Sequence, residues 1–229
     1  MLLIVAKEDK YINNLLNKLE YTKENVDNIN VYNCKYMDHN FLIIITSYGK
    51  VNVASSLIRI FNKYRIRVIV QMGTCQSISN DLDILNAVIY KGALQYDVDF
   101  SPLGYSPSIF PFMDTGIYFT NDDLRKCMED SCSKCNVNYT NNLISSADMF
   151  VSNNNLAKSV RVCFNSSSID DYSGTIGQIA YINKIPFVGI NIVSSYANNN
   201  AVKLYNLYDN EASSICQKIV YKFIKEYYS

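Results

Sequence analysis

Residues 185–197 read Ile-Pro-Phe-Val-Gly-Ile-Asn-Ile-Val-Ser-Ser-Tyr-Ala, a run in which apolar side chains give way to small polar ones. The apolar part after Pro186 predicts a buried β-strand, because strands covered on both faces read as nearly continuous hydrophobic runs. In α/β folds, the carboxyl ends of such strands open onto a ligand crevice. We therefore expect Ser194 and Ser195 to lie at the edge of a binding site.

Similar apolar runs recur along the chain and alternate with segments of helical periodicity. The runs that we interpret as strands span residues 2–6, 41–46, 68–72, 83–90 and 143–151. The segments that we interpret as helices span residues 9–19, a stretch after 51, 122–135, 172–182 and 210–228. Strands that alternate with helices predict a central sheet with helices on both faces, here as a single α/β domain over residues 1–229.

The overall composition excludes several classes of protein. The chain has 229 residues, of which 48% are hydrophobic, and it carries 21 basic and 21 acidic side chains. A balanced charge gives no reason to expect nucleic acid or an anionic membrane as a partner. No apolar run approaches the roughly 20 residues that a membrane-spanning helix needs.

The seven cysteines are scattered, and only Cys132 and Cys135 form a CxxC pair. A zinc site would need a second pair or histidine partners, and His39 is the only histidine, so we expect no metal. An odd cysteine count without a secretory segment favours the cytoplasm.

Residues 97–115 form a long segment that contains three of the four prolines. Proline removes a backbone donor and fixes φ, so regular structure is not expected there. Long ordered loops in compact domains are usually functional or lie at interfaces, although a simple surface lid is an alternative.

Five stretches together resemble the purine nucleoside phosphorylase and nucleosidase superfamily, and above all the 5'-methylthioadenosine/S-adenosylhomocysteine nucleosidases. The resemblance is carried by their shared order and spacing over almost the whole chain. The stretches are Ser47-Tyr-Gly-Lys-Val-Asn-Val-Ala54, Met72-Gly-Thr74, Tyr96-Asp-Val-Asp99 with Leu103-Gly-Tyr105, Ser145-Ser-Ala-Asp-Met-Phe150, and Asp170-Asp-Tyr-Ser-Gly-Thr-Ile-Gly-Gln-Ile-Ala-Tyr181.

The resemblance implies a three-layer α/β sandwich with a mixed, partly barrel-like central sheet. It also implies a homodimer built through the loop near residues 101–113, and hydrolysis of the N-glycosidic bond of methylthioadenosine or S-adenosylhomocysteine without a cofactor. Such cleavage needs an acid for the departing purine and a carboxylate for the ribose hydroxyls. It also needs a polar cluster for the attacking water and an aromatic side chain beside the base.

Several of these positions carry other residues here. Ser195 stands where the family has the purine acid, and a serine hydroxyl does not donate a proton at neutral pH. Tyr172 stands at the ribose carboxylate, and Asp171 stands where the family has a methionine under the sugar. The nearby Asp170 retains the first acid of that motif, and either aspartate could replace the missing groups.

The water site also departs from the family pattern. Lys10 aligns with the glutamate that orients water, so that Glu8 or Asp9 would serve if the turn shifts. Asn191 aligns with an arginine of the last strand. Lys10 could equally be a solvated lysine, or could bind an anion if it faces the pocket.

Other features of the family site are retained. Thr74 keeps a hydroxyl at the water or anion position, and Phe150 keeps the aromatic side chain expected beside the base. Val151 and Ser194 belong to the same substrate-binding wall. Simpler interpretations stand beside these: Gly73 and Thr74 as a turn with glycine at positive φ, Phe150 as a core residue, and Asp170 with Asp171 as an acidic helix start.

Two functions follow from the sequence. The first is a nucleosidase for adenine thionucleosides, with Asp170, Glu8 or Asp9 covering for lost groups. The second is a non-catalytic nucleoside-binding or dimeric interaction protein on the same fold, which the substitutions at Ser195 and Tyr172 favour. A phosphorylase is disfavoured, because no arginine occupies the matching motifs to bind phosphate.

Overall fold

The computed structural model describes all 229 residues. The strands are β1 (Leu2–Ala6), β2 (Glu20–Val26), β3 (Ile29–Tyr36), β4 (His39–Ile45), β5 (Val68–Ser77), β6 (Ala87–Val88), β7 (Gly92–Gln95), β8 (Ile117–Phe119), β9 (Tyr139–Thr140), β10 (Leu143–Ser146), β11 (Ser166–Asp170) and β12 (Phe187–Tyr196). The helices are η1 (Asp9–Tyr11), α1 (Asn13–Leu16), α2 (Lys50–Lys63), η2 (Ser101–Leu103), α3 (Asp122–Ser133), α4 (Asn154–Phe164), α5 (Ser173–Ile182) and α6 (Ala201–Tyr227).

All strands belong to one mixed sheet that branches at β5. The main path runs β2-β3-β4-β1-β5-β11-β10-β7-β8, while β12 pairs with β5 and β6, and β6 pairs with β9. β5 is parallel to β1 and β12 but antiparallel to β11. The branch curls the sheet toward a barrel around β5, which confirms the predicted mixed, partly barrel-like sheet.

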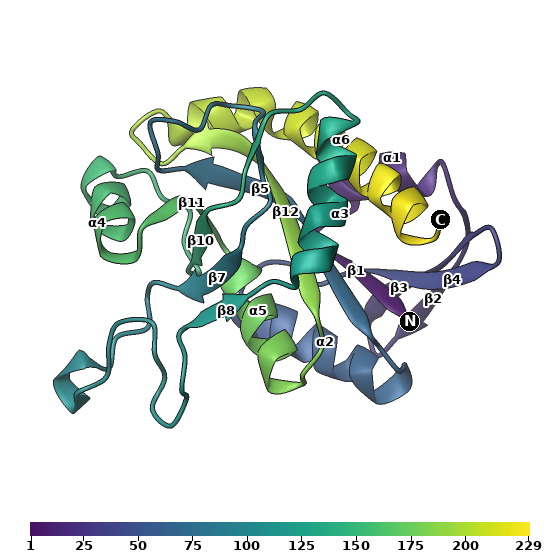
Figure 1. The fold of residues 1–229 in the computed structure, drawn as a ribbon, viewed down its shortest axis with the longest axis horizontal. Coiled ribbons are helices and arrows are strands. Elements are labelled where there is room, and N and C mark those ends of the chain that lie inside the picture. The colour runs from purple at the N-terminus through teal and green to yellow at the C-terminus, as the bar shows by residue number, and fades with distance from the viewer.

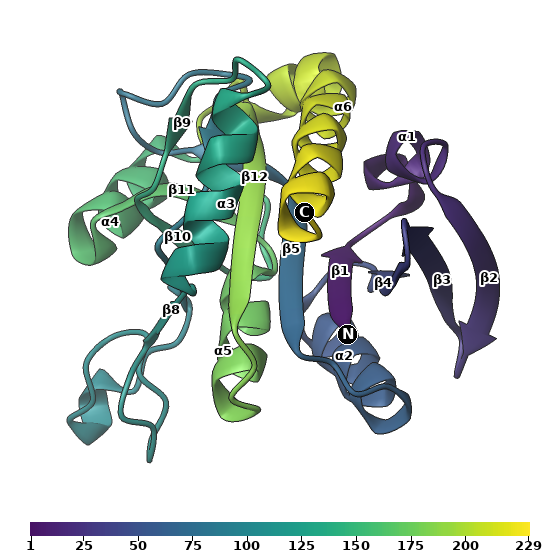
Figure 2. The same cartoon turned by 45° about the vertical axis from the view of Figure 1, so that its right-hand side comes forward.

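Helices cover both faces of this sheet, as the alternation of strands and helices predicted (Figure 1). One apolar core joins the sheet to α1, α3 and α6, and a second joins it to α2 and α5. The C-terminal helix α6 lies along β12 and β5, and Figure 2 shows it on the opposite side of the strands from α2. The structure is therefore a three-layer α/β sandwich.

Several predicted elements have other boundaries. The helix expected over 9–19 is two short pieces, η1 and α1, and the strand expected over 83–90 is only β6. The interpretation of Gly73 as a turn with positive φ is wrong, because Gly73 continues β5 and its φ is not positive. A Cβ atom at Gly73 would lie 2.1 Å from the Tyr172 hydroxyl, so glycine is required there for close packing.

The proline-rich segment is a long loop that projects from the body of the molecule in Figure 1, with η2 near its tip. Leu103 is 70% exposed and Phe112 is 99% exposed on this loop. None of the helices has both the length and the apolar character that crossing a bilayer would require.

Candidate functional site

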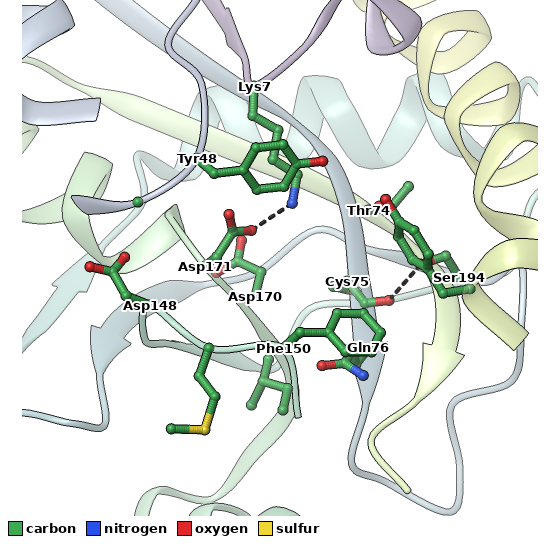
Figure 3. A pocket seen from close by; sticks show the side chains of 14 residues that line it. Lys7, Tyr48, Thr74, Cys75, Gln76, Asp148, Phe150, Asp170, Asp171 and Ser194 are labelled. Carbon is green, nitrogen blue, oxygen red and sulfur yellow. Dashed lines mark hydrogen bonds and ion pairs between the residues drawn. The ribbon is translucent and has the colours of Figure 1, made fainter. Parts of the chain in front are cut away.

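A cavity of about 490 Å³ opens where β1, β5, β11 and β12 end (Figure 3). Because β1, β5 and β12 are parallel, their carboxyl ends meet at one side of the sheet, where ligands bind in this class of fold. The cavity is lined by Lys7, Tyr48, Gly49, Thr74, Cys75, Gln76, Asp148, Met149, Phe150, Ile169, Asp170, Asp171, Ser194 and Tyr205.

A buried ion pair crosses one wall of the cavity. Lys7 directly follows β1, and its Nζ lies 2.5 Å from Oδ1 of Asp171 (Figure 3). The Lys7 ammonium also lies 4.9 Å from the ring centroid of Tyr48 and 5.1 Å from that of Tyr172. Burial lowers the pKa of Lys7, but the charge of Asp171 and the hydrogen bond to it outweigh burial, so the net shift is upward. Lys7 is therefore a fixed cation and not an amine nucleophile.

The second carboxylate oxygen of Asp171 is available to a ligand. Oδ2 is buried and has no hydrogen-bond partner, although the residue lines the cavity. An ionised carboxylate only accepts hydrogen bonds, and a buried acceptor without a donor is costly. A ligand hydroxyl group that donates to Oδ2 would remove that cost.

Asp170 is buried in a set of hydrogen-bond donors. It accepts hydrogen bonds from the Ser146 hydroxyl at 2.6 Å, from the Asn191 amide at 3.1 Å, from the backbone N–H of Tyr172 at 3.3 Å, and from the hydroxyl and backbone N–H of Ser173. Although Asp170 lines the cavity, these donors already use its oxygens. Its geometry is that of a residue that organises the start of α5.

The pKa of Asp170 is raised, first by burial and then by the negative charge of Asp171. The hydrogen bonds from Ser146 and Ser173 and the charge of Lys7 act in the opposite direction. Because the pKa in the folded state exceeds the usual 3.8, the contribution of Asp170 to stability is greatest below that value and declines as the pH rises through the raised pKa.

We expect the substitution Asp170→Asn to destabilise the fold by about 1–3 kcal/mol at neutral pH, because the new NH₂ group would face donors and leave some of them unpaired. Urea denaturation followed by circular dichroism measures this. Asp81→Asn, at an exposed site, is the control and should leave the midpoint unchanged. An unchanged midpoint for Asp170→Asn would show that the donors do not hold the carboxylate.

Tyr172 is fully buried and does not line the cavity. Its hydroxyl donates a hydrogen bond to the backbone carbonyl of Met72 at 2.5 Å, and its ring packs within the core that joins the sheet to α2 and α5. The hydroxyl oxygen occupies the space left by the missing Cβ of Gly73. Tyr172 therefore fills volume behind the cavity wall and presents no polar group to a ligand.

The two serines at the end of β12 have different surroundings because the strand register shifts between Val193 and Ser195. Ser194 lines the cavity, and its hydroxyl lies 3.5 Å from the carbonyl of Cys75. Ser195 is fully buried, does not line the cavity, and accepts a hydrogen bond from the Gln76 amide at 3.3 Å.

Gln76 makes a paired contact that the sequence did not predict. Its amide nitrogen donates to the carbonyl of Val151 at 2.8 Å, and its amide oxygen accepts from the backbone N–H of Val151 at 2.8 Å. Gln76 thus satisfies both backbone groups of Val151 at the cavity wall. A ligand with adjacent donor and acceptor atoms would compete with the Gln76 amide for the backbone N–H and carbonyl of Val151.

Aromatic side chains also line the cavity. Phe150 is 46% exposed, so its interpretation as a core residue is wrong, and its ring meets the ring of Tyr205 edge to face at 5.5 Å. Tyr48 is 45% exposed, lines the cavity and lies beside Lys7 in Figure 3. These rings offer an apolar surface for a flat ligand.

A polar cluster lies beside Thr74 and includes Asp209, which the sequence did not predict. The Thr74 hydroxyl donates to Asp209 at 2.7 Å, the Tyr11 hydroxyl lies 3.1 Å from each oxygen of the same carboxylate, and Nζ of Lys10 lies 2.8 Å from it. Lys10 also pairs with Glu8 at 3.0 Å. Burial lowers the pKa of Lys10, but its hydrogen bonds, led by that to Asp209, produce a net rise, so Lys10 is no free solvated lysine.

Glu8 and Asp9 do not line the cavity. Glu8 accepts a hydrogen bond from the Tyr48 hydroxyl and pairs with Lys10, and Asp9 accepts one from the Tyr32 hydroxyl at 3.3 Å. The structure thus brings Thr74, Phe150, Asp170, Asp171 and Ser194 together at the cavity. It leaves Glu8, Asp9, Lys10, Val151, Tyr172 and Ser195 behind the wall or beside it.

Comparisons with known proteins agree with this architecture. A family model described as "Phosphorylase superfamily" matches residues 2–225. The 5'-methylthioadenosine/S-adenosylhomocysteine nucleosidase of Buchnera aphidicola subsp. Schizaphis graminum is 27% identical over 97% of this chain and 94% of its own length. The enzyme of that name from Staphylococcus carnosus is 26% identical over 83% of this chain and 84% of its own.

Solved structures share the whole fold. The nucleosidase of that name from Neisseria meningitidis, in complex with methylthio-immucillin-A, superposes with a TM-score of 0.93 at 19% identity, covering 98% of each chain. The Helicobacter pylori nucleosidase gives a TM-score of 0.93 at 14% identity, covering 98% of this chain and 97% of that one. The resemblance predicted from the sequence motifs is confirmed, and this chain belongs to the phosphorylase superfamily.

Proposed function

We propose that this protein hydrolyses the N-glycosidic bond of adenine thionucleosides such as methylthioadenosine or S-adenosylhomocysteine. The observation that carries the proposal is the cavity itself, which joins an aromatic wall to a carboxylate with a free acceptor at the carboxyl ends of the strands. Relatives that match most of the chain bear the name of a nucleosidase for these compounds, which supports the same substrate class.

The cavity has an aromatic part and a carboxylate part, and each would bind a different part of a nucleoside. The purine would lie against Phe150 and Tyr205, whose rings form the apolar wall. The ribose hydroxyls would donate to Oδ2 of Asp171, the one buried carboxylate oxygen at the cavity without a partner. Lys7 pairs with Asp171 and orients it, so that this aspartate would replace the carboxylate that the resemblance assigns to the position of Tyr172.

For the departing purine, the residue at the expected position offers no acid. Ser195 is not an acid, and its only polar neighbour toward the cavity is the Gln76 amide at 3.3 Å. An amide can donate a hydrogen bond but cannot transfer a proton. General acid catalysis typically contributes about 10²–10⁴-fold, so we expect turnover to be slower by about that factor than in an enzyme with the acid.

The test is release of adenine from methylthioadenosine, measured by liquid chromatography in phosphate-free buffer and again with added phosphate. A hydrolase releases adenine at the same rate in both. Release that requires phosphate would overturn the proposal in favour of phosphorolysis. No release, with or without phosphate, would overturn the assignment of hydrolysis.

The second candidate is a nucleoside-binding protein without catalysis. The observation that favours it is the arrangement at two family positions: Ser195 offers no acid, and Tyr172 is packed in the core. Calorimetric titration of methylthioadenosine separates the two functions, since binding without adenine release supports the second. In that case Ser195→Asp, which adds an acid next to Gln76, is expected to create release from a pocket that already binds.

We further propose a homodimer that forms through the loop near residues 101–113. Its support is the exposure of Leu103 at 70% and Phe112 at 99%, on a loop that projects from the body. Burial of these two side chains against a second copy of the chain would remove their apolar surface from water. We also propose a cytoplasmic location, which the odd number of cysteines in the sequence supports.

Phe112→Ser is expected to convert the dimer to a monomer, because it removes a fully exposed apolar ring from the proposed contact. Light scattering after size exclusion measures the mass, which should fall from twice the chain mass of 26.1 kDa to the chain mass itself. Val162→Ser, at an apolar residue that is 73% exposed on α4, is the matched control and should stay dimeric. A wild-type monomer would refute the dimer.

A further inference from the structure

Two oppositely charged side chains from distant parts of the chain meet beside the cavity. Lys10 lies in η1, just after β1, and Asp209 lies on α6, with 2.8 Å between Nζ and Oδ2. Asp209 is only 4% exposed. In the family pattern the position of Lys10 carries the glutamate that orients water. In this chain the carboxylate beside Lys10 and Thr74 comes from α6.

The hydrogen bond between Asp209 and Thr74 fixes the direction of the Thr74 hydroxyl. A carboxylate can only accept, so the contact of 2.7 Å requires Thr74 to donate its single proton to Asp209. Thr74 also lines the cavity. What Thr74 can offer to a ligand is therefore an oxygen lone pair, which accepts a hydrogen bond from a group that carries a proton.

We propose that Asp209 acts through Thr74 to hold the attacking water and take up its proton, an inference that rests on the hydrolase activity proposed above. Asp209 does not line the cavity, so it is a positioning residue, and Thr74 is the group that touches the water. Tyr11 holds the carboxylate from a second side at 3.1 Å, and Lys10 neutralises it. The cluster is thereby preorganised before a nucleoside binds.

The reaction balances without any added reagent. The water oxygen forms a bond to the anomeric carbon while the bond from that carbon to the purine nitrogen breaks, and the purine leaves with the electron pair. The water proton passes to the Thr74 oxygen as the Thr74 proton passes to Asp209. Solvent then takes the proton from Asp209 and gives one to the purine.

The same arrangement disfavours phosphate as the attacking group. A phosphate dianion needs donors, but the Thr74 proton is already used and a carboxylate lies directly behind it. The nearby cations are also occupied, since Lys10 pairs with Glu8 and Asp209, and Lys7 pairs with Asp171. Water, which donates, fits the lone pair of Thr74.

The experiment compares the full-length protein with Asp209→Asn in steady-state adenine release from methylthioadenosine. Asparagine keeps the shape and an acceptor but cannot take a proton. We expect kcat to fall by about 10²-fold or more while KM changes little, because proton transfer typically contributes about 10²–10⁴-fold. Glu211→Gln is the matched control, since it removes one negative charge from an exposed position on the same helix and should leave both constants unchanged.

A double substitution tests whether both residues act on one water. Thr74→Val alone should also lower kcat, and the variant with both changes should lose no more than the worse single variant. Additive losses would indicate independent structural roles and overturn the inference. Calorimetric titration of methylthioadenosine confirms in each case that the variant folds and binds.

The outcomes separate this inference from the proposed function. If the wild-type protein releases adenine and Asp209→Asn releases it equally fast, only the role of Asp209 is refuted. A loss confined to KM would refute it as well, because that result describes binding and not proton transfer. If the wild-type protein releases no adenine, the proposed function and this inference fall together.

Discussion

Replacing Lys7 by methionine is expected to lower the free energy of unfolding by about 3–5 kcal/mol at neutral pH, because removal of one member of a buried ion pair leaves an uncompensated charge. Lys7 and Asp171 are 7% and 17% exposed, and 2.5 Å separates their charged atoms. Without Lys7, no cation would offset the mutual repulsion of the Asp170 and Asp171 carboxylates. Urea denaturation followed by circular dichroism measures the loss.

The pH dependence of this loss has a definite sign. Lys7 lowers the pKa of Asp170, so its removal raises that pKa further above 3.8. A raised pKa in the folded state costs stability above it and not below, so the variant should recover part of its stability as the pH falls toward about 4. A loss that stays constant between neutral and acidic pH would contradict the electrostatic account.

A double substitution separates stability from function at the same pair. Lys7→Met together with Asp171→Leu replaces both charges by apolar side chains, and such replacements of buried pairs are often neutral or stabilising. We expect this variant to regain most of the stability lost by Lys7→Met but to bind no nucleoside, since Asp171 is gone. Binding of methylthioadenosine by the double variant would show that Asp171 does not hold the ribose.

Placing at position 172 the glutamate that the resemblance assigns to the ribose site is expected to destabilise the protein strongly and not to improve its activity. Tyr172 is fully buried, and loss of a buried aromatic side chain typically costs about 3–5 kcal/mol. The new carboxylate would also be a third negative group beside Asp170 and Asp171, with Lys7 as their cation. Thermal denaturation of Tyr172→Glu should therefore show a large drop in midpoint.

Tyr172→Phe is the control for that experiment. It removes only the hydrogen bond from the hydroxyl to the Met72 carbonyl, which typically contributes about 0.5–1.5 kcal/mol. A stable Tyr172→Glu variant with faster adenine release would contradict our account. It would show that the tyrosine occupies an otherwise intact ribose site and that Asp171 is not its replacement.

The apolar strands of the sheet could be predicted from the sequence because burial on both faces removes polar residues from them. The hairpin of β2 and β3 could not, since exposed polar residues such as Lys23 and Asn25 interrupt its alternation. The extension of β5 through Gly73 to Ser77 was missed for the opposite reason. Its polar side chains are buried in the barrel-like part of the sheet, where they form hydrogen bonds.

The candidate site could be predicted where its residues belong to the motifs at strand ends. Thr74, Phe150 and Asp171 line the cavity as expected from those motifs. Asp209 lies far along the chain, and only the tertiary fold brings it to Thr74 and Lys10. Its one sequence signal is a carboxylate three residues before Ala212, on the buried stripe of α6.

The most direct test of the central claim is calorimetric titration of methylthioadenosine into the wild-type protein, with adenine followed by chromatography in the same samples. Our account predicts saturable binding at one site per chain together with adenine release that does not depend on phosphate. Absence of both binding and release would contradict it, because the cavity would then not be a nucleoside site.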